Sequence, residues 1–156
     1  MLGFLRRKRK ETYGPFVYLS EPTLLYNTRT ERAILEIVME KLNSNNILVP
    51  SKYGLRDTSG RIKDAEVLVA VALLGKFTSL VGREVKMARE LNKRIYTMEV
   101  GREGDELVYL WEDRVPEDVE WLDPDETMDF TKSFVNSEFS DVLRRGIFVG
   151  SRKRGW

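Results

Sequence analysis

The longest uninterrupted apolar run of the chain, residues 67–74, is followed by a helical pattern and then by a second apolar segment. The run is rich in valine and too short to cross a membrane, which is typical of a strand buried on both faces of a parallel sheet. Residues 80–91 repeat apolar side chains at the helical period, and residues 94–99 again alternate like a strand. These segments predict a strand–helix–strand unit around which the rest of the chain is organised.

Three further strands and two further helices follow from the same patterns. Thr28 and Glu31 have the spacing of a capping box, which marks a helix start and gives Glu31 a structural role. The loop between residues 51 and 64 carries two glycines and mixed charges, and it is long enough to cover a site. The additional strands are expected at 16–19, 47–49 and 106–111, and the additional helices at 29–43 and 126–145.

The order of these elements predicts an α/β fold. We expect a three-layer, Rossmann-like or flavodoxin-like sandwich, with a mostly parallel five-stranded sheet and helices on both faces. The length of 156 residues suits a single domain. Its core is expected at 15–145, between a basic arm at 1–14 and a basic tail at 146–156. We expect both ends to be solvated, with contact to an anionic surface or nucleic acid as the alternative.

Composition limits the chemistry that is available. The chain contains no cysteine and no histidine, so thiol catalysis is excluded and no metal site is expected. It also lacks a dinucleotide-type glycine fingerprint and a Walker lysine loop, so no cofactor is expected. Any acid–base or nucleophilic chemistry must therefore use carboxylates, hydroxyls or lysine.

Charge and hydropathy predict a soluble protein with a heavily charged surface. Hydrophobic residues make up 42% of the chain and charged residues 33%, and the net charge is +1. Such a balance gives no general attraction to nucleic acid or membranes. No apolar run reaches transmembrane length and the start is too short for a signal peptide, so we expect a cytoplasmic protein. The abundance of Lys, Arg and Glu is typical of thermophilic proteins.

Glu84 is the most informative residue of the predicted helix. On a helical projection it lies inside the apolar stripe, between Leu91 and Ala88, whereas the other charged residues lie on the opposite side. A carboxylate in that position must be paired, neutral or in use, because burial without a partner is costly. Two structural alternatives remain open: an ion pair with a distant basic residue, or a place at the edge of the stripe that reaches solvent.

Topology places Glu84 near a ligand crevice. In open α/β sheets ligands bind beyond the carboxyl ends of the strands, where the strand order reverses. The loops at that point are residues 20–27 and 75–79, and Glu84 lies about one turn into the helix that follows the second loop. A glutamate, hydroxyls and helix-start amides, without His or Cys, suit attack at the anomeric carbon of a sugar.

The same residues resemble a known family. The segments at 65–70, 79–84 and 93–95, together with Ala88, are similar to the nucleoside 2-deoxyribosyltransferase superfamily, including its 2'-deoxynucleoside 5'-phosphate N-hydrolase branch. The resemblance covers roughly residues 16–99. It implies that Glu84 is the nucleophile and that Gly82 is the small residue before it. It also implies a homo-oligomer whose neighbouring subunits complete the pocket.

The resemblance suggests further site residues. The acid at the start of the third strand corresponds to Glu66, with Asp64 two residues earlier, so either is a candidate polar partner of Glu84. The first strand and its loop would supply ligand contacts, here Tyr18 and Ser20, and Ser79 is a further contact. Alternatively, Tyr18 is an aromatic residue of the core and Ser79 is only the N-cap of the helix. Residues 20–26 replace the glycine-rich phosphate loop of the hydrolase branch.

Three functions follow as hypotheses. The first is cleavage or transfer of the N-glycosidic bond of a nucleoside or nucleotide. The second is a non-catalytic nucleotide-binding or sensing module on the same fold, which the altered first loop favours. The third is an interaction protein that contacts nucleic acid through its two basic ends.

Overall fold

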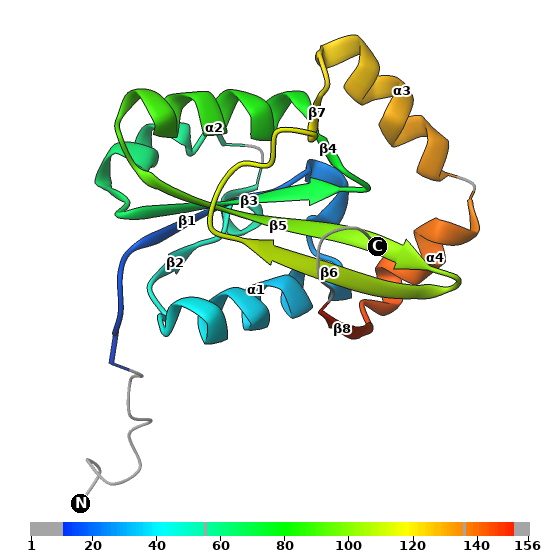
Figure 1. Cartoon of the computed structure of the whole chain (residues 1–156), viewed down its shortest axis with the longest axis horizontal. Helices are drawn as coiled ribbons and strands as arrows, with labels where there is room; N and C mark the ends of the chain where they lie inside the picture. The colour runs from blue at the N-terminus through cyan, green and yellow to red at the C-terminus, as the bar shows by residue number, and fades with distance from the viewer. Residues whose placement is uncertain (1–10, 55, 136, 152–156) are drawn as a thin grey trace, which may run out of the picture.

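The computed structural model describes residues 11–54, 56–135 and 137–151, and it shows an α/β protein with a mostly parallel mixed sheet (Figure 1). The main path of the sheet runs in the order β2-β1-β3-β5-β6-β8, and all neighbouring pairs on it are parallel except β5 and β6. The strand bounds are β1 Val17–Ser20, β2 Ile47–Leu48, β3 Val67–Leu73, β4 Lys76–Phe77, β5 Arg94–Glu103, β6 Glu106–Glu112, β7 Glu120–Trp121 and β8 Phe148–Ser151.

The prediction of a five-stranded sheet was wrong in its count. The five expected strands form, but the described residues contain eight strands. β4 and β7 have only two residues each and pair with one another, so neither has enough length to show a periodic pattern. β8 takes up residues 148–151 of the expected basic tail and pairs with β6.

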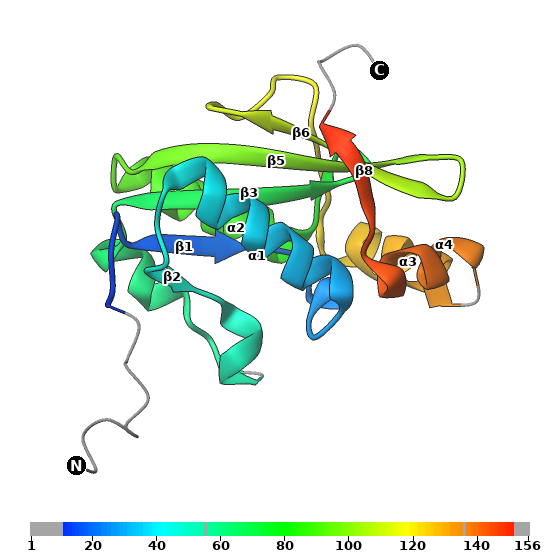
Figure 2. The same cartoon turned by 90° about the horizontal axis from the view of Figure 1, so that it is seen from below.

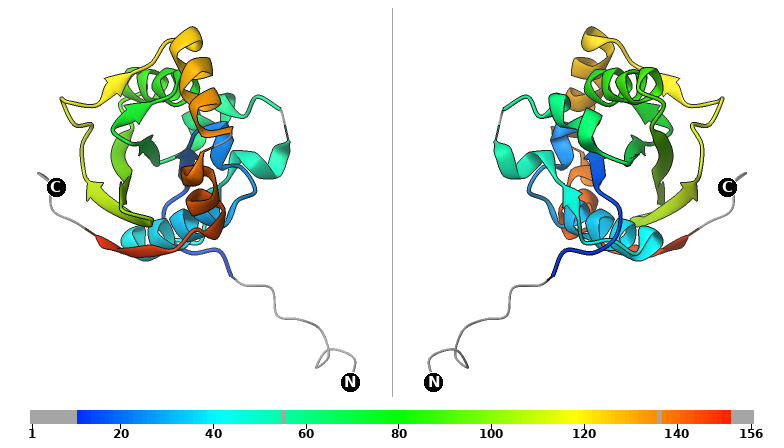
Figure 3. Two further views of the ribbon diagram at one scale, coloured as in Figure 1. Left: turned by 90° about the vertical axis from the view of Figure 1, so that its right-hand side faces the viewer. Right: turned by 90° about the vertical axis from the view of Figure 1, so that its left-hand side faces the viewer.

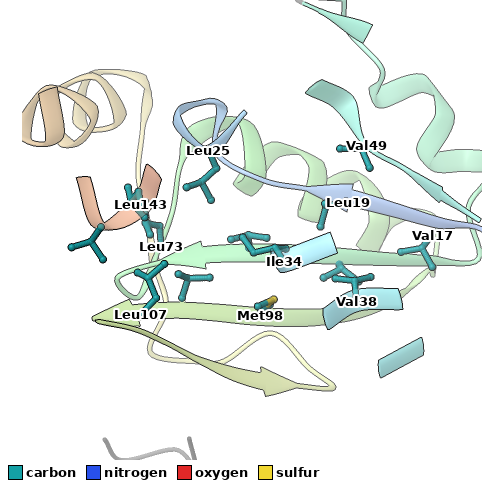
Figure 4. Packing of buried hydrophobic residues seen from close by; sticks show 14 of the residues in the cluster. Val17, Leu19, Leu25, Ile34, Val38, Val49, Leu73, Met98, Leu107 and Leu143 are labelled. Atoms are coloured by element: carbon teal, nitrogen blue, oxygen red, sulfur yellow. The ribbon is translucent and has the colours of Figure 1, made fainter. Parts of the chain in front are cut away.

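Helices cover both faces of the sheet, as Figure 3 shows for α1 and α2. β3 is buried along its whole length and divides its side chains between the two faces, because successive residues of a strand point in opposite directions. Val69 and Val71 belong to the larger core cluster, which includes Ile34 and Val38 of α1 (labelled in Figure 4). Ala70 and Ala72 belong to the cluster that includes Val81 of α2. The helix bounds are α1 Arg29–Leu42, α2 Ser79–Glu90, α3 Pro124–Val135 and α4 Glu138–Arg145.

The C-terminal helical region consists of two helices, so the prediction of one helix over 126–145 was wrong. Asp123 and Glu126 form reciprocal hydrogen bonds at the start of α3, with Pro124 in its first turn. Ser137 then caps α4 by accepting a hydrogen bond from the Ser140 amide at 3.3 Å. In a continuous helix the Ser140 amide would donate to a backbone carbonyl of the preceding turn. Here it donates to the Ser137 side chain, which marks the start of a new helix.

A tight turn after α4 returns the chain to the sheet (Figure 2). Gly146 ends α4 with a φ of +62°, and a Cβ at this position would collide with the backbone of Arg29. The hydroxyl of Thr30 also donates a hydrogen bond to the carbonyl of Leu143. These contacts tie α4 to the start of α1, next to the loop that follows β1.

Part of the expected N-terminal arm is attached to the core. The side chain of Asn45 accepts a hydrogen bond from the Tyr13 amide at 2.7 Å and donates one to the Glu11 carbonyl at 2.8 Å. The basic run at 6–10 lies outside the described residues, as does the run at 152–154. Across the described part of the chain, no helix has both the length and the apolar character needed to cross a membrane.

Candidate functional site

Glu84 is buried and hydrogen-bonded by two hydroxyl groups. Its side chain lies on the second turn of α2 with 2% of its surface exposed. The Tyr18 hydroxyl donates to Oε2 at 2.5 Å, and the Ser20 hydroxyl donates to Oε1 at 2.8 Å. Neither structural alternative holds within the described residues, since Glu84 has no basic partner and does not reach solvent.

The sheet explains why these three residues meet. Tyr18 and Ser20 are two positions apart on β1, so both point to the face that α2 covers. β1 and β3 are adjacent and parallel, with Tyr18 opposite Leu68 and Ser20 opposite Ala70. The strand order reverses between them, as the sequence predicted for a ligand crevice. The small side chain of Ala70 leaves room for α2 to bring Glu84 against β1.

The electrostatics of Glu84 combine two opposing effects. Burial raises the pKa of the Glu84 carboxyl above its ordinary value, and the hydrogen bonds from Tyr18 and Ser20 oppose this rise by stabilising the anion. Burial and the negative charge of Glu84 in turn raise the pKa of Tyr18. Tyr18 therefore keeps its proton at neutral pH and remains a hydrogen-bond donor to Glu84.

Glu84 and Tyr18 line a cavity of about 220 Å³. Its other walls come from the loop after β1, from residues 50, 54 and 56–58, and from α2. The Tyr18 hydroxyl also contacts the hydroxyl of Thr58 at 2.7 Å, which connects β1 to the second loop. The remaining lining residues are Thr23, Tyr26, Pro50, Gly54, Arg56, Asp57, Leu80 and Arg83. Of the segment at 51–64, which the sequence predicts to cover a site, Gly54, Arg56, Asp57 and Thr58 line this cavity.

Asp57 is the second carboxylate of this cavity, and sequence reasoning did not single it out. It is exposed, and its side chain accepts a hydrogen bond from the Ser59 amide at 2.9 Å. The hydrogen bonds from Ser59, together with the nearby charge of Arg83, hold the pKa of Asp57 below its ordinary value. The cavity thus contains one buried and one exposed carboxylate whose pKa values are shifted in opposite directions.

The structure separates the other predicted residues from Glu84. Asp64 is exposed, at the end of a short 3₁₀ helix, and its carboxylate pairs with Arg61 at 3.3 Å. Glu66 is exposed just before β3. Neither residue lines the cavity, because both precede the amino end of β3, whereas the crevice lies at its carboxyl end. Asp57 is the carboxylate that the fold brings to Glu84.

Ser79 and Gly82 lie on α2 but face a neighbouring cleft rather than this cavity. The N-cap of α2 is Thr78, so the alternative of Ser79 as the N-cap was wrong. The Ser79 amide donates to the Thr127 hydroxyl at 2.8 Å. Gly82 packs beneath Trp121, where a Cβ would lie 3.1 Å from the ring.

A second buried glutamate lies beside the site. Glu21 follows β1 directly and is 1% exposed, and neither of its carboxylate oxygens has a hydrogen-bond partner of good geometry among the described residues. Burial and the adjacent carboxyl of Glu31 raise the pKa of Glu21 well above its ordinary value. Thr28 caps α1, as predicted, by accepting a hydrogen bond from the Glu31 amide at 3.2 Å. The Glu31 carboxylate accepts a hydrogen bond from the Asn27 amide at 3.2 Å, rather than from the Thr28 amide that a capping box would use.

Tyr26 lies between the two acidic sites. It lines the cavity, and burial together with the charges of Glu21, Glu84 and Glu31 raises its pKa to about 12. Within the described residues, no group of three or more acidic side chains is arranged to hold a metal ion.

Comparison with protein-family models, with curated proteins and with solved structures finds no match to this chain.

Proposed function

We propose that the protein cleaves or transfers the N-glycosidic bond of a nucleoside or nucleotide, with Glu84 as the nucleophile. The observation that carries the proposal is the environment of Glu84: a buried carboxylate held by two hydroxyl donors at the wall of a cavity. Hydrogen bonds fix the orientation of the carboxylate and favour its charged form, which is the form that attacks. The resemblance of residues 79–84 to the deoxyribosyltransferase superfamily supports the same role.

The proposed reaction has two steps. A Glu84 oxygen attacks the anomeric carbon, the carbon–nitrogen bond breaks, and its electron pair leaves with the base, which takes a proton from solvent. The resulting glycosyl ester is then attacked by water in hydrolysis, or by a second base in transfer. Either attack regenerates the Glu84 carboxylate, and the attacking group loses its proton to a base.

Asp57 is the proposed base of the second step. Its lowered pKa keeps it ionised at neutral pH, and it lines the same cavity as Glu84. In the first step its negative charge would stabilise the positive charge that develops on the sugar. Tyr18 and Ser20 act as positioning residues through Glu84.

The test is to incubate the protein with deoxynucleosides and their 5'-monophosphates and to measure free base by chromatography. We expect release by the wild type and a large loss in Glu84→Gln. Glu21→Gln is the matched control, because it changes another buried glutamate that does not line the cavity. No release by the wild type, or equal release by wild type and Glu84→Gln, contradicts the proposal.

A second candidate function is binding of a nucleotide without turnover. It is favoured by the loop after β1, where Glu21 and Pro22 stand in place of the glycine-rich phosphate loop of the hydrolase branch. Such a module would be stabilised against heat by its ligand but would release no base. A homo-oligomer in the cytoplasm, suggested by the family resemblance and by composition, completes the proposal, and size-exclusion chromatography tests the oligomeric state.

A further inference from the structure

A larger cleft adjoins the candidate site on the outer side of α2. It has a volume of about 440 Å³ and lies between α2 and residues 121–124. Arg83 lines both this cleft and the cavity that contains Glu84, so the two spaces are neighbours. The full lining consists of Ser79, Gly82, Arg83, Lys86, Trp121, Leu122, Asp123 and Pro124.

Trp121 forms a fixed aromatic wall of this cleft. Its ring packs against Gly82, where a Cβ would lie only 3.1 Å away, and it meets the Phe77 ring edge-to-face with centroids 5.1 Å apart. β7, which ends at Trp121, is held by its parallel pairing with β4 and by the ion pair between Lys76 and Glu120. The tryptophan is thus supported from three sides while remaining partly exposed.

Positive charge gathers around this tryptophan. Gly82, Lys86 and Arg89 lie four and then three residues apart, so they form one stripe along α2. The Lys86 ammonium lies 5.6 Å from the centre of the Trp121 ring, and the Arg89 guanidinium carbon lies 5.3 Å from it. Such distances allow attraction between the cations and the ring, which holds both side chains beside the cleft.

These cations are not neutralised by carboxylates. In the described part of the chain, neither Lys86 nor Arg89 forms an ion pair, and Arg83 lies near Asp57 and Glu84 without forming one. The one acidic side chain of the cleft, Asp123, accepts a hydrogen bond from the Glu126 amide at 2.7 Å as a helix cap. The cleft therefore presents two basic side chains, Arg83 and Lys86, and Arg89 lies beside the same aromatic ring.

We propose that the α2–β7 cleft, lined by Arg83, Lys86 and Trp121 with Arg89 at its side, binds the backbone of a single-stranded nucleic acid. Unpaired basic side chains that follow a backbone, combined with an aromatic surface for a base, are the features that recognise single strands. A strand bound there brings a nucleotide to the adjoining cavity, where Arg83 meets its phosphate and Glu84 its sugar. A nucleotide within a chain is then a further substrate unit of the same site, in addition to a free nucleoside or nucleotide.

This inference rests on the proposed function only for bond cleavage at Glu84. Binding of the strand in the cleft is measured separately. It also differs from the hypothesis that nucleic acid is bound by the basic ends at 6–10 and 152–154. The cleft lies on the folded core, so its contribution should persist when those ends are removed.

The test measures the affinity of the full chain for fluorescent oligonucleotides of about ten residues, oligodeoxythymidylate and oligouridylate, by anisotropy at about 50 and 200 mM salt. Lys86→Glu with Arg89→Glu is expected to weaken binding at least about tenfold and to reduce the log–log salt slope by about 1.4, because each phosphate contact contributes about 0.7. Trp121→Leu is expected to weaken binding about tenfold through lost stacking.

The matched control is Arg32→Glu with Lys41→Glu, which makes the same change in net charge at exposed positions of α1. It is expected to change affinity by less than about twofold at the higher salt, where distant charges are screened. Equal weakening by both double variants, loss of binding only when residues 1–10 are removed, or equal affinity for a free mononucleotide overturns the inference. Circular dichroism checks folding, and Lys86→Ala replaces the double variant if the latter does not fold.

The two proposals fail in different ways. Strand binding located in the cleft without base release keeps this inference and rejects the catalytic role of Glu84. Base release from nucleosides with no strand binding keeps the catalytic role and rejects the inference.

Discussion

Glu84 and Glu21 are two buried glutamates beside the loop after β1. They differ in their hydrogen bonds and in their access to the cavity. Glu84 receives hydrogen bonds from Tyr18 and Ser20 and lines a cavity. Glu21 has no hydrogen-bond donor of good geometry among the described residues. Its neighbour Glu31 is also an acid, so the two side chains would repel each other if both were ionised. Burial raises the pKa of both, but only Glu84 is supplied with donors that favour its anion.

The comparison shows that burial of a carboxylate does not by itself identify a functional group. In the proposed function, the hydroxyl donors and the adjoining cavity prepare Glu84 to react with a ligand. The position of Glu21 favours a protonated carboxyl next to Glu31, which removes one of two adjacent negative charges. A pKa raised by burial therefore accompanies a candidate nucleophile at Glu84 and a structural contact at Glu21.

The largest expected effect distinguishes the two glutamates by activity. Glu84→Gln should reduce base release by at least about 10³-fold, because the amide retains the shape but not the nucleophile. Glu21→Gln should stay within about threefold of the wild type, since Glu21 does not line the cavity. Initial rates with a deoxynucleoside give both values, and similar losses in the two variants would remove the distinction.

The next effect concerns the second carboxylate of the cavity. Asp57→Asn should lower kcat by about tenfold to a hundredfold, because it removes the proposed base and a negative charge near the sugar. Asp64→Asn is the control, since Asp64 is an exposed acid that lies outside the cavity. A larger loss from Asp64→Asn than from Asp57→Asn would return the role to the residue that the sequence suggested.

A smaller effect tests the donors of Glu84. Tyr18→Phe removes the hydrogen bond that lowers the pKa of Glu84, so this pKa rises further and less of the carboxylate is ionised at a given pH. Activity should fall about tenfold, and the acid limb of the pH–rate profile should move to higher pH. Tyr53→Phe, at an exposed position, is the control. An unchanged acid limb in Tyr18→Phe would show that Glu84 does not set it.

The smallest expected effect is on the free energy of unfolding and concerns Glu21 alone. Its pKa is raised in the folded protein, so the folded state binds the proton more tightly than the unfolded chain. The resulting stabilisation is present below the unfolded value of 4.5 and is lost as pH rises through the folded value. Glu21→Gln should therefore be more stable than the wild type at about pH 7.5, by about 1–2 kcal/mol, and this advantage should shrink in acid.

Thermal melts across pH measure this effect, with Glu36→Gln on the exposed face of α1 as the control. A gain of that size corresponds to a Tm higher by about 2–8 °C in a protein of this length. A Glu21→Gln variant whose stability follows the wild type at every pH would show that Glu21 is not held protonated.

The sequence was sufficient to predict those elements that depend on short-range hydrophobic patterns. The valine-rich run at 67–73 and the helical stripe of α2 predicted the central unit, and the place of Glu84 within that stripe predicted its burial. Patterns failed where long-range pairing decides: β8 forms because Gly146 turns the chain back to β6, and β7 forms because it pairs with β4. Both contacts join segments that are far apart in sequence.

The site shows the same division. Tyr18 and Ser20 were identified as candidates, but their bonds to Glu84 depend on how β1 lies against α2. Asp57 was missed because its loop has no periodic pattern, although a short acid two residues before Ser59 is a turn signal. Asp64 and Glu66 were suggested by their place before β3, and the direction of that strand puts them away from the cavity.

The most direct test of the account is to identify the atom that bonds to the sugar. A 2-fluoro-substituted nucleoside, which slows the second step, would be incubated with the protein and the product digested and analysed by mass spectrometry. We predict that one glycosyl group is added and that it lies on Glu84, with none in Glu84→Gln. Base release without an adduct, or an adduct on Asp57 instead, would contradict the assignment of Glu84 as the nucleophile.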